Sequence, residues 1–187
     1  GEMSLAFQPI FDLTDGRAVG AEALLRWTHP ELGLVPPATF IAIAEDSGQV
    51  DVIGHRVLDE AMRAAARWQV PSGTRAPFVA INVSPRQLSL GDLPETVEGV
   101  LRRTGLDPLR LHLELTETAI LRDEAQATAA FTRLRALGVG VWLDDFGTGF
   151  SGLSHLRRVP VDGVKIDRSF HVVVAADDKA QIAALFG

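Results

Sequence analysis

Oxygen-bearing or charged side chains stand near the ends of several apolar stretches, at Glu22, Asn82, Glu114, Asp144, Asp145 and Lys165. Several carboxylates that meet in one place cannot all stay ionised without a cation among them. In a chain without cysteine, hard oxygen ligands favour Mg²⁺ or Mn²⁺ over zinc. Two such ions could activate water for an in-line displacement at phosphorus, and Lys165 could orient that water or offset phosphate charge.

Alternating strand-like and helix-like segments must position these residues. Strands are predicted at Leu5–Leu13, Ala18–Trp27, Phe78–Ser84, Leu111–Thr116, Val139–Asp145 and Gly163–Asp167. Amphipathic helices are predicted at Val50–Trp68, Leu93–Arg103, Ala125–Leu137 and Lys179–Phe186. This alternation is typical of parallel βα units. The sequence "TDGR" directly joins the first two strands and predicts a hairpin, so the first strand should be antiparallel to the second.

Five of the predicted strands have one aliphatic face and one face with a polar residue near the C-terminal end. For example, Glu114 shares a face with His112, a candidate partner for it, whereas Leu111, Leu113 and Leu115 point the other way. An open sheet covered on both sides would need two apolar faces, and isolated buried charges would be costly. A barrel explains the asymmetry, because (β/α) barrels gather their sites at the C-terminal mouth. We therefore predict an α/β, TIM-like (β/α)8 barrel with an antiparallel first strand.

The adjacent aspartates need a separate explanation, because neighbours on a strand point to opposite faces. Asp144 has the parity of the barrel interior. We expect Asp145 to lie where the strand gives way to a loop, and the glycines that follow permit a sharp exit.

The composition limits the class of protein. The chain has 187 residues, 47% of them hydrophobic, which is typical of one soluble domain. Its net charge of −6 argues against binding to DNA or RNA duplexes, which requires a basic surface. The sequence contains neither an apolar stretch as long as a membrane span nor a signal-peptide pattern. A cytoplasmic location is expected, although the parent protein could be membrane-anchored.

Several motifs resemble those of the EAL domain, a bacterial family of cyclic di-GMP phosphodiesterases. They occur in the family's order, as "FQPI", "EALLRW", "INVSPRQL", "LELTET", "DDFGTGFSGLSHL" and "VKIDRSF". The segment "GLVPPATFIAIAEDSG" is similar as well. The resemblance extends from about Gly1 to at least Phe170. It implies hydrolysis of one phosphodiester bond of cyclic di-GMP, by a water that divalent metal activates, to give linear pGpG.

The resemblance also implies roles for single residues. Five positions match metal ligands, for two Mg²⁺ or Mn²⁺ ions in all: Glu22, Asn82, Glu114, Asp144 and Asp145. Glu22, Asp145 and Lys165 match catalytic residues, of which Asp145 serves the second metal and the nucleophilic water and Lys165 touches that water.

Four further positions match residues around the substrate. Gln8, Leu24 and Arg26 match substrate-binding positions, with Arg26 placed for a phosphate. Glu117 matches a glutamate that steadies the glycine-containing loop after Asp145.

Two family motifs are missing from the sequence, a catalytic glutamate in an "EGVE"-like motif and a glutamine near the end. The six predicted strands also fall short of the eight strands and about 250 residues of a complete barrel. We therefore interpret residues 1–187 as an EAL domain that is truncated after about six strands and lacks the family's C-terminal strands and motifs.

The missing motifs favour a second hypothesis, a catalytically impaired EAL domain that acts as a cyclic di-GMP receptor or a protein-interaction module. Judged without the resemblance, enolase-type proton abstraction would also fit, with carboxylates on Mg²⁺ and Lys165 as the base. A Schiff-base aldolase fits less well, because a lysine among acids stays protonated. By analogy with the family, we expect a homodimer and an N-terminal sensor or GGDEF domain in the parent protein.

Overall fold

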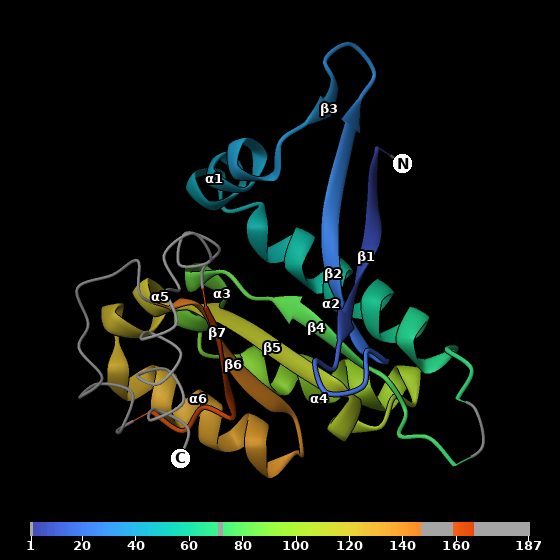
Figure 1. Cartoon of the computed structure of the whole chain (residues 1–187). Helices are drawn as coiled ribbons and strands as arrows, with labels where there is room; N and C mark the ends of the chain where they lie inside the picture. The colour runs from blue at the N-terminus through green and yellow to red at the C-terminus, as the bar shows by residue number, and fades with distance from the viewer. Residues whose placement is uncertain (1, 71–72, 147–158, 167–187) are drawn as a thin grey trace, which may run out of the picture.

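The computed structural model describes residues 2–70, 73–146 and 159–166. Their strands form one mixed sheet in the order β1-β2-β4-β5-β6-β7, and β3 pairs with the far end of β2 (Figure 1). The strands are β1 Met3–Phe11, β2 Ala18–His29, β3 Gly33–Val35, β4 Phe78–Asn82, β5 Leu111–Thr116, β6 Gly140–Phe146 and β7 Gly163–Ile166. All pairs from β2 to β7 along this path are parallel. The carboxyl ends of β4, β5, β6 and β7 therefore lie at one end of the sheet, and β2 runs past that end.

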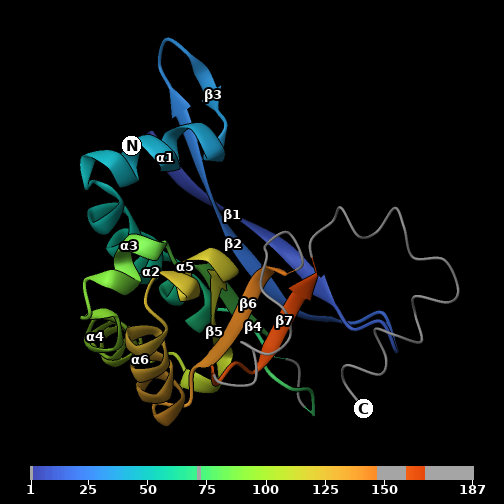
Figure 2. The same ribbon diagram turned by 90° about the vertical axis from the view of Figure 1, so that its left-hand side faces the viewer.

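Helices connect the strands, and α2, α4 and α6 lie together over one face of the sheet (Figure 2). The helices are α1 Pro37–Ser47, α2 Val50–Ala66, α3 Pro85–Ser89, α4 Leu93–Thr104, the 3-10 turn η1 Pro108–Arg110, α5 Glu117–Arg122 and α6 Glu124–Ala136. Helix α4 ends at Gly105, which has a φ of 70° and so adopts the left-handed conformation that glycine accepts readily.

The hairpin between β1 and β2 confirms the predicted antiparallel start of the sheet. Its turn is closed by the amide of Asp12, which donates to the carbonyl of Arg17 at 2.9 Å, and by the amide of Gly16, which donates to the carbonyl of Asp12. The hairpin and β3 extend away from the rest of the sheet (Figure 1). The residues of β2 that follow Glu22 and share its face therefore lie on this extended part of the strand.

The aliphatic faces of the strands pack against the helices, as their alternation predicts. The side chains of Val79 and Ile81 on β4 and of Leu113 on β5 are almost fully buried, and they belong to one cluster with Leu58 of α2 and Phe131 of α6. The opposite faces of the same strands are left to the polar residues. One hydrophobic core therefore holds the strands in the register that the site needs.

The structure differs from the sequence-based expectation in several short elements. Strand β3 and helices α1, α3 and α5 were not predicted, and β1 begins at Met3 rather than Leu5. These helices are short or have a weak amphipathic pattern, so periodicity does not reveal them. The helix predicted at Lys179–Phe186 lies outside the described residues.

Candidate active site

Lys165 of β7 lies among three carboxylates from three other strands. Its Nζ donates to Glu114 Oε2 at 2.7 Å, to Glu22 Oε2 at 3.1 Å and to Asp144 Oδ2 at 3.4 Å. The pKa of Lys165 is lowered by burial, but its hydrogen bond with Glu114 and the neighbouring carboxylates raise it above the ordinary value overall. Lys165 is therefore an ammonium ion at neutral pH.

Asn82 joins this cluster through Glu22. The Nδ2 of Asn82, at the end of β4, donates to Glu22 Oε1 at 2.7 Å. Glu22 therefore contacts Lys165 with one carboxylate oxygen and Asn82 with the other. The structure thus brings together five of the six candidate residues, Glu22, Asn82, Glu114, Asp144 and Lys165, from five parallel strands.

Glu114 is the most buried of these acids, and its residue is 1% exposed. Its Oε1 is buried and accepts no hydrogen bond from the described residues. Burial raises the pKa of Glu114 to about 7, and this effect outweighs the attraction of Lys165. A buried carboxylate oxygen without a partner can accept a hard cation or a donor from a ligand.

Asp144 and Asp145 occupy an irregularity in β6 rather than the end of the strand. Leu143 pairs with Val164 and Phe146 pairs with Ile166, so the two aspartates stand opposite one residue of β7, Lys165. Asp145 has a φ of 54°, in the left-handed region, and its amide donates to Asp144 Oδ1 at 3.0 Å. This pattern is a β-bulge, which breaks the alternation of side chains and re-aims them.

This arrangement corrects the expected position of Asp145. The strand does not give way to a loop between the aspartates but continues to Phe146. Asp145 is exposed, whereas Asp144 is partly buried and faces Lys165. The glycines after Asp145 lie outside the described residues.

The predicted substrate-binding residues lie along the same face of the hairpin as Glu22. Leu24 and Arg26 follow Glu22 at every second position of β2, and both are partly buried. Gln8 of β1 pairs directly with Glu22 and is exposed. Arg26 Nη1 donates to the carbonyl of Leu25 at 3.0 Å. Leu24 and Arg26 therefore continue this face along β2, and Gln8 lies beside Glu22.

Glu117 is the first residue of α5, directly after β5, and it is buried. Neither of its carboxylate oxygens accepts a hydrogen bond from the residues that the structure describes. The glycine-containing segment that Glu117 is predicted to steady lies outside the described residues, so this role remains a prediction.

His112 is not joined to Glu114 by a hydrogen bond in the described part of the chain. Its ring stacks on Phe78 with the ring centres 4.2 Å apart, and its Nδ1 is buried without a hydrogen-bond partner there. Burial lowers the pKa of His112 to about 4. The imidazole is therefore neutral at pH 7 and adds no positive charge beneath the carboxylates.

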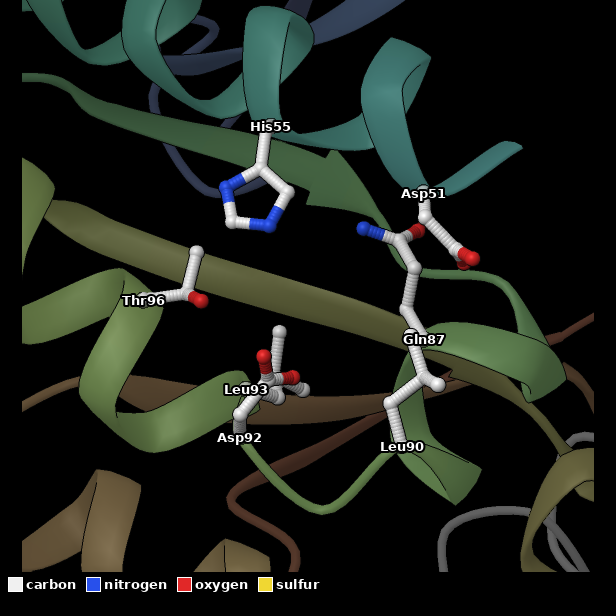
Figure 3. A pocket seen from close by; sticks show the side chains of 7 residues that line it. All are labelled: Asp51, His55, Gln87, Leu90, Asp92, Leu93 and Thr96. Atoms are coloured by element: carbon white, nitrogen blue, oxygen red, sulfur yellow. The ribbon is translucent and has the colours of Figure 1, made fainter. Parts of the chain in front are cut away.

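A small hollow lies among the helices (Figure 3). Its lining residues are Asp51, His55, Gln87, Leu90, Asp92, Leu93 and Thr96. They come from α2, from α4 and from α3 with its flanking turns, and none belongs to the sheet face that carries Lys165. None was singled out in the sequence as a candidate for chemistry. The hollow is therefore separate from the candidate active site.

In the described part of the chain, no set of three or more acidic, histidine or cysteine side chains is already arranged as a metal site. The Lys165 ammonium lies between the carboxylates instead. The nature of the donors still suits a hard divalent cation, because carboxylate and amide oxygens are what such ions bind.

Comparison with known proteins agrees with this set of motifs. The family model described as "EAL domain" matches residues 1–185. The chain belongs to the EAL domain family. The predicted family and the α/β, TIM-like fold class are thereby confirmed.

Curated relatives of this EAL domain include much longer proteins. The bifunctional diguanylate cyclase/cyclic di-GMP phosphodiesterase MucR of Pseudomonas aeruginosa is 39% identical over 186 residues, which cover 98% of this chain and 27% of MucR. An uncharacterized signaling protein of Caulobacter vibrioides is 44% identical over 179 residues, which cover 96% of this chain and 22% of the relative. The EAL domain therefore spans about a quarter of the length of these two relatives.

Solved structures share the fold closely. The MucR phosphodiesterase in its c-di-GMP complex has a TM-score of 0.87 and 39% identity, covering 98% of this chain and 74% of that one. The EAL enzyme Bd1971, in its cAMP and cyclic-di-GMP bound form, has a TM-score of 0.88 and 35% identity, covering 98% of this chain and 51% of that one.

Among the described residues, no helix has both the length and the apolar character to cross a membrane.

Proposed function

We propose that this EAL domain hydrolyses one phosphodiester bond of cyclic di-GMP and releases linear pGpG. The observation that carries the proposal is the meeting of Lys165 with Glu22, Glu114 and Asp144, each from a different strand. Relatives named as cyclic di-GMP phosphodiesterases support the reaction, and a related structure in a c-di-GMP complex supports the substrate.

We further propose that the domain uses two Mg²⁺ or Mn²⁺ ions. Their ligands would be Glu22, Asn82, Glu114, Asp144 and Asp145. The buried Glu114 Oε1, which accepts no hydrogen bond from the described residues, is the structural feature that fits such an ion. When bound, the ions supply the charge that activates water and offsets the charge of the phosphate.

The side chains of the chain have distinct tasks in this proposal. Lys165 stays charged and orients the attacking water, while Asp145 accepts a proton from it. The water oxygen bonds to phosphorus, the bond from phosphorus to the ribose 3′ oxygen breaks, and that oxygen takes up a proton. Arg26 pairs with a phosphate, and Leu24 and Gln8 contact the dinucleotide.

The assembly around the domain is also proposed by analogy. We expect a homodimer, an N-terminal sensor or GGDEF domain in the parent protein, and a cytoplasmic location for the domain itself. The great length of relatives such as MucR supports additional domains. Light scattering of the purified protein would test the dimer, and a monomer at micromolar concentration would contradict it.

Turnover tests the proposal directly. Incubation with cyclic di-GMP and Mn²⁺ should yield pGpG on chromatography, and Asp144→Asn and Asp145→Asn should each lower kcat at least 100-fold. Asp144→Asn should cost more metal affinity, because Asp144 faces the carboxylate cluster. Asp92→Asn, in the separate hollow, is the matched control and should keep full activity.

Two results would contradict these assignments. Binding of cyclic di-GMP without turnover by the wild-type protein would favour the receptor or interaction module instead. Full activity in either aspartate variant would remove that residue from the site.

A further inference from the structure

Three aromatic side chains from neighbouring strands pack together on the polar face of the sheet. Phe78 of β4 and His112 of β5 are stacked, with an angle of 6° between their planes. Trp142 of β6 meets both rings edge-on, with its centroid 5.3 Å from that of Phe78 and 4.5 Å from that of His112. We call these three residues the aromatic floor.

Each ring of the aromatic floor lies against a glycine of the adjacent strand. Phe78 pairs with Gly20, His112 with Gly140 and Trp142 with Gly163. A Cβ atom added to Gly140 would lie 3.1 Å from the His112 ring, and one added to Gly163 would lie 2.9 Å from Trp142 Nε1. Cβ atoms essentially never approach other atoms within 3.0 Å. A side chain at position 163 would therefore displace the Trp142 ring, and one at position 140 would fit only if the His112 ring shifted by a few tenths of an ångström.

The aromatic floor and its glycines lie directly beneath the candidate active site. Residues two apart on a strand share a face, and four of the site residues follow a member of this layer by two positions. The pairs are Gly20 and Glu22, His112 and Glu114, Trp142 and Asp144, and Gly163 and Lys165. Thus four residues of the cluster stand one step above a ring or a glycine that accommodates a ring.

We propose that Phe78, His112 and Trp142 are positioning residues. They fix the relative positions of the strand segments that bear the carboxylates and Lys165. Rigid rings packed across three strands fix the separation of the strand ends, and a displacement of about 1 Å can cost a catalytic site about 100-fold in rate. This inference rests on the proposed phosphodiesterase function, because it concerns the alignment of that same site.

Gly163→Ala is the sharpest test, because its methyl group must displace Trp142 without touching a charged residue of the cluster. We expect kcat for cyclic di-GMP to fall at least tenfold with KM changed less than threefold. The affinity for Mn²⁺, measured from free Mn²⁺ by electron paramagnetic resonance, should weaken at least fivefold. A merely structural role would lower the melting temperature but would leave kcat and Mn²⁺ affinity unchanged below it.

Gly99→Ala is the matched control. A Cβ atom at Gly99 would meet only the end of the flexible Arg103 side chain, at 3.5 Å, on helix α4. This variant should keep the wild-type kcat and Mn²⁺ affinity. If Gly163→Ala does not fold, Trp142→Leu replaces it, because it removes a ring of the floor and adds no atom beside a glycine.

The results separate the two proposals. Loss of both kcat and Mn²⁺ affinity in the folded variant supports the aromatic floor, whereas a wild-type value for either quantity overturns it. If the wild-type protein binds Mn²⁺ but does not hydrolyse cyclic di-GMP, the proposed function fails. The positioning role of the aromatic floor is then judged from the Mn²⁺ affinity of the variant relative to wild type alone. A wild-type protein that binds no Mn²⁺ overturns both.

Discussion

At the scale of single residues, the protonation of Glu114 makes the site sensitive to pH. Its carboxyl group is enclosed by protein and is contacted by one cation, Lys165, among the described residues. Burial raises its pKa to about 7, from an ordinary value of 4.5. The charge of the site therefore changes in the range where the enzyme would work.

This shift predicts a pH dependence of the free energy of unfolding in metal-free protein. The folded state holds the proton up to about pH 7, whereas the unfolded chain releases it near pH 4.5. The stability from this group is therefore fully present below pH 4.5 and is lost as the pH rises through 7. The change is at most about 3 kcal/mol, and urea unfolding at pH 5 and pH 8 would measure it.

Glu114→Gln should abolish that loss, because the amide does not titrate. The same substitution at exposed Glu98, which pairs with Arg102 on the surface of α4, should leave the wild-type pH dependence in place. An equal loss of stability in wild type and Glu114→Gln would show that another group is responsible.

At the scale of elements, the bulge in β6 explains how one strand presents two adjacent carboxylates at the same end of the sheet. The extra residue stands opposite Lys165, and Asp145 accepts a positive φ to make the bulge. Aspartate tolerates this conformation better than most residues, and glycine tolerates it best. The positive φ at position 145 therefore favours glycine, whereas the proposed reaction needs a carboxylate there.

Substitutions at Asp145 should separate these demands. Both variants lose whatever the aspartate side chain contributes, so their difference isolates the backbone: Asp145→Ala should be about 1 kcal/mol less stable than Asp145→Gly, because its Cβ is strained at positive φ. Both variants should lose turnover. Urea unfolding and a pGpG assay would measure the two effects, and equal stability of the two variants would argue against the left-handed bulge.

The alternation of residues was enough to predict most of the sheet and the meeting of Glu22, Glu114, Asp144 and Lys165. The bulge could not be predicted in this way, because an alternation rule assumes that each residue has one partner. The aromatic floor could not be predicted in this way either, because nothing in the sequence distinguishes Trp142 from a tryptophan of the core, and His112 was expected to be a partner for Glu114. Its signal was a glycine opposite each ring, which becomes visible only when the register of the strands is known.

At the scale of the whole molecule, Lys165 ties the last described strand to three others. Its bonds reach β2, β5 and β6 and so connect the hairpin side of the sheet with the opposite edge. The ammonium also balances negative charge that would otherwise repel itself. Folding of the domain and charge balance at the site thus depend on the same side chain.

Lys165→Met should therefore make stability depend on metal. Removing one partner of a buried ion pair costs about 3–5 kcal/mol, and partial exposure of Lys165 reduces this to about 2–3 kcal/mol. We expect a melting temperature about 5–10 °C below wild type in a chelator. Mn²⁺ should raise the melting temperature more in the variant than in wild type, and an equal rise in both would contradict this account.

The pairing of each floor ring with a glycine restricts the order in which this sequence can change. A methyl group at position 163 meets the Trp142 ring, whereas a smaller side chain at position 142 meets no obstacle from Gly163. A lineage could therefore acquire the larger residue on β7 without damage only after the ring on β6 had shrunk. Positions 142 and 163 should therefore change together among related sequences, with the ring shrinking first.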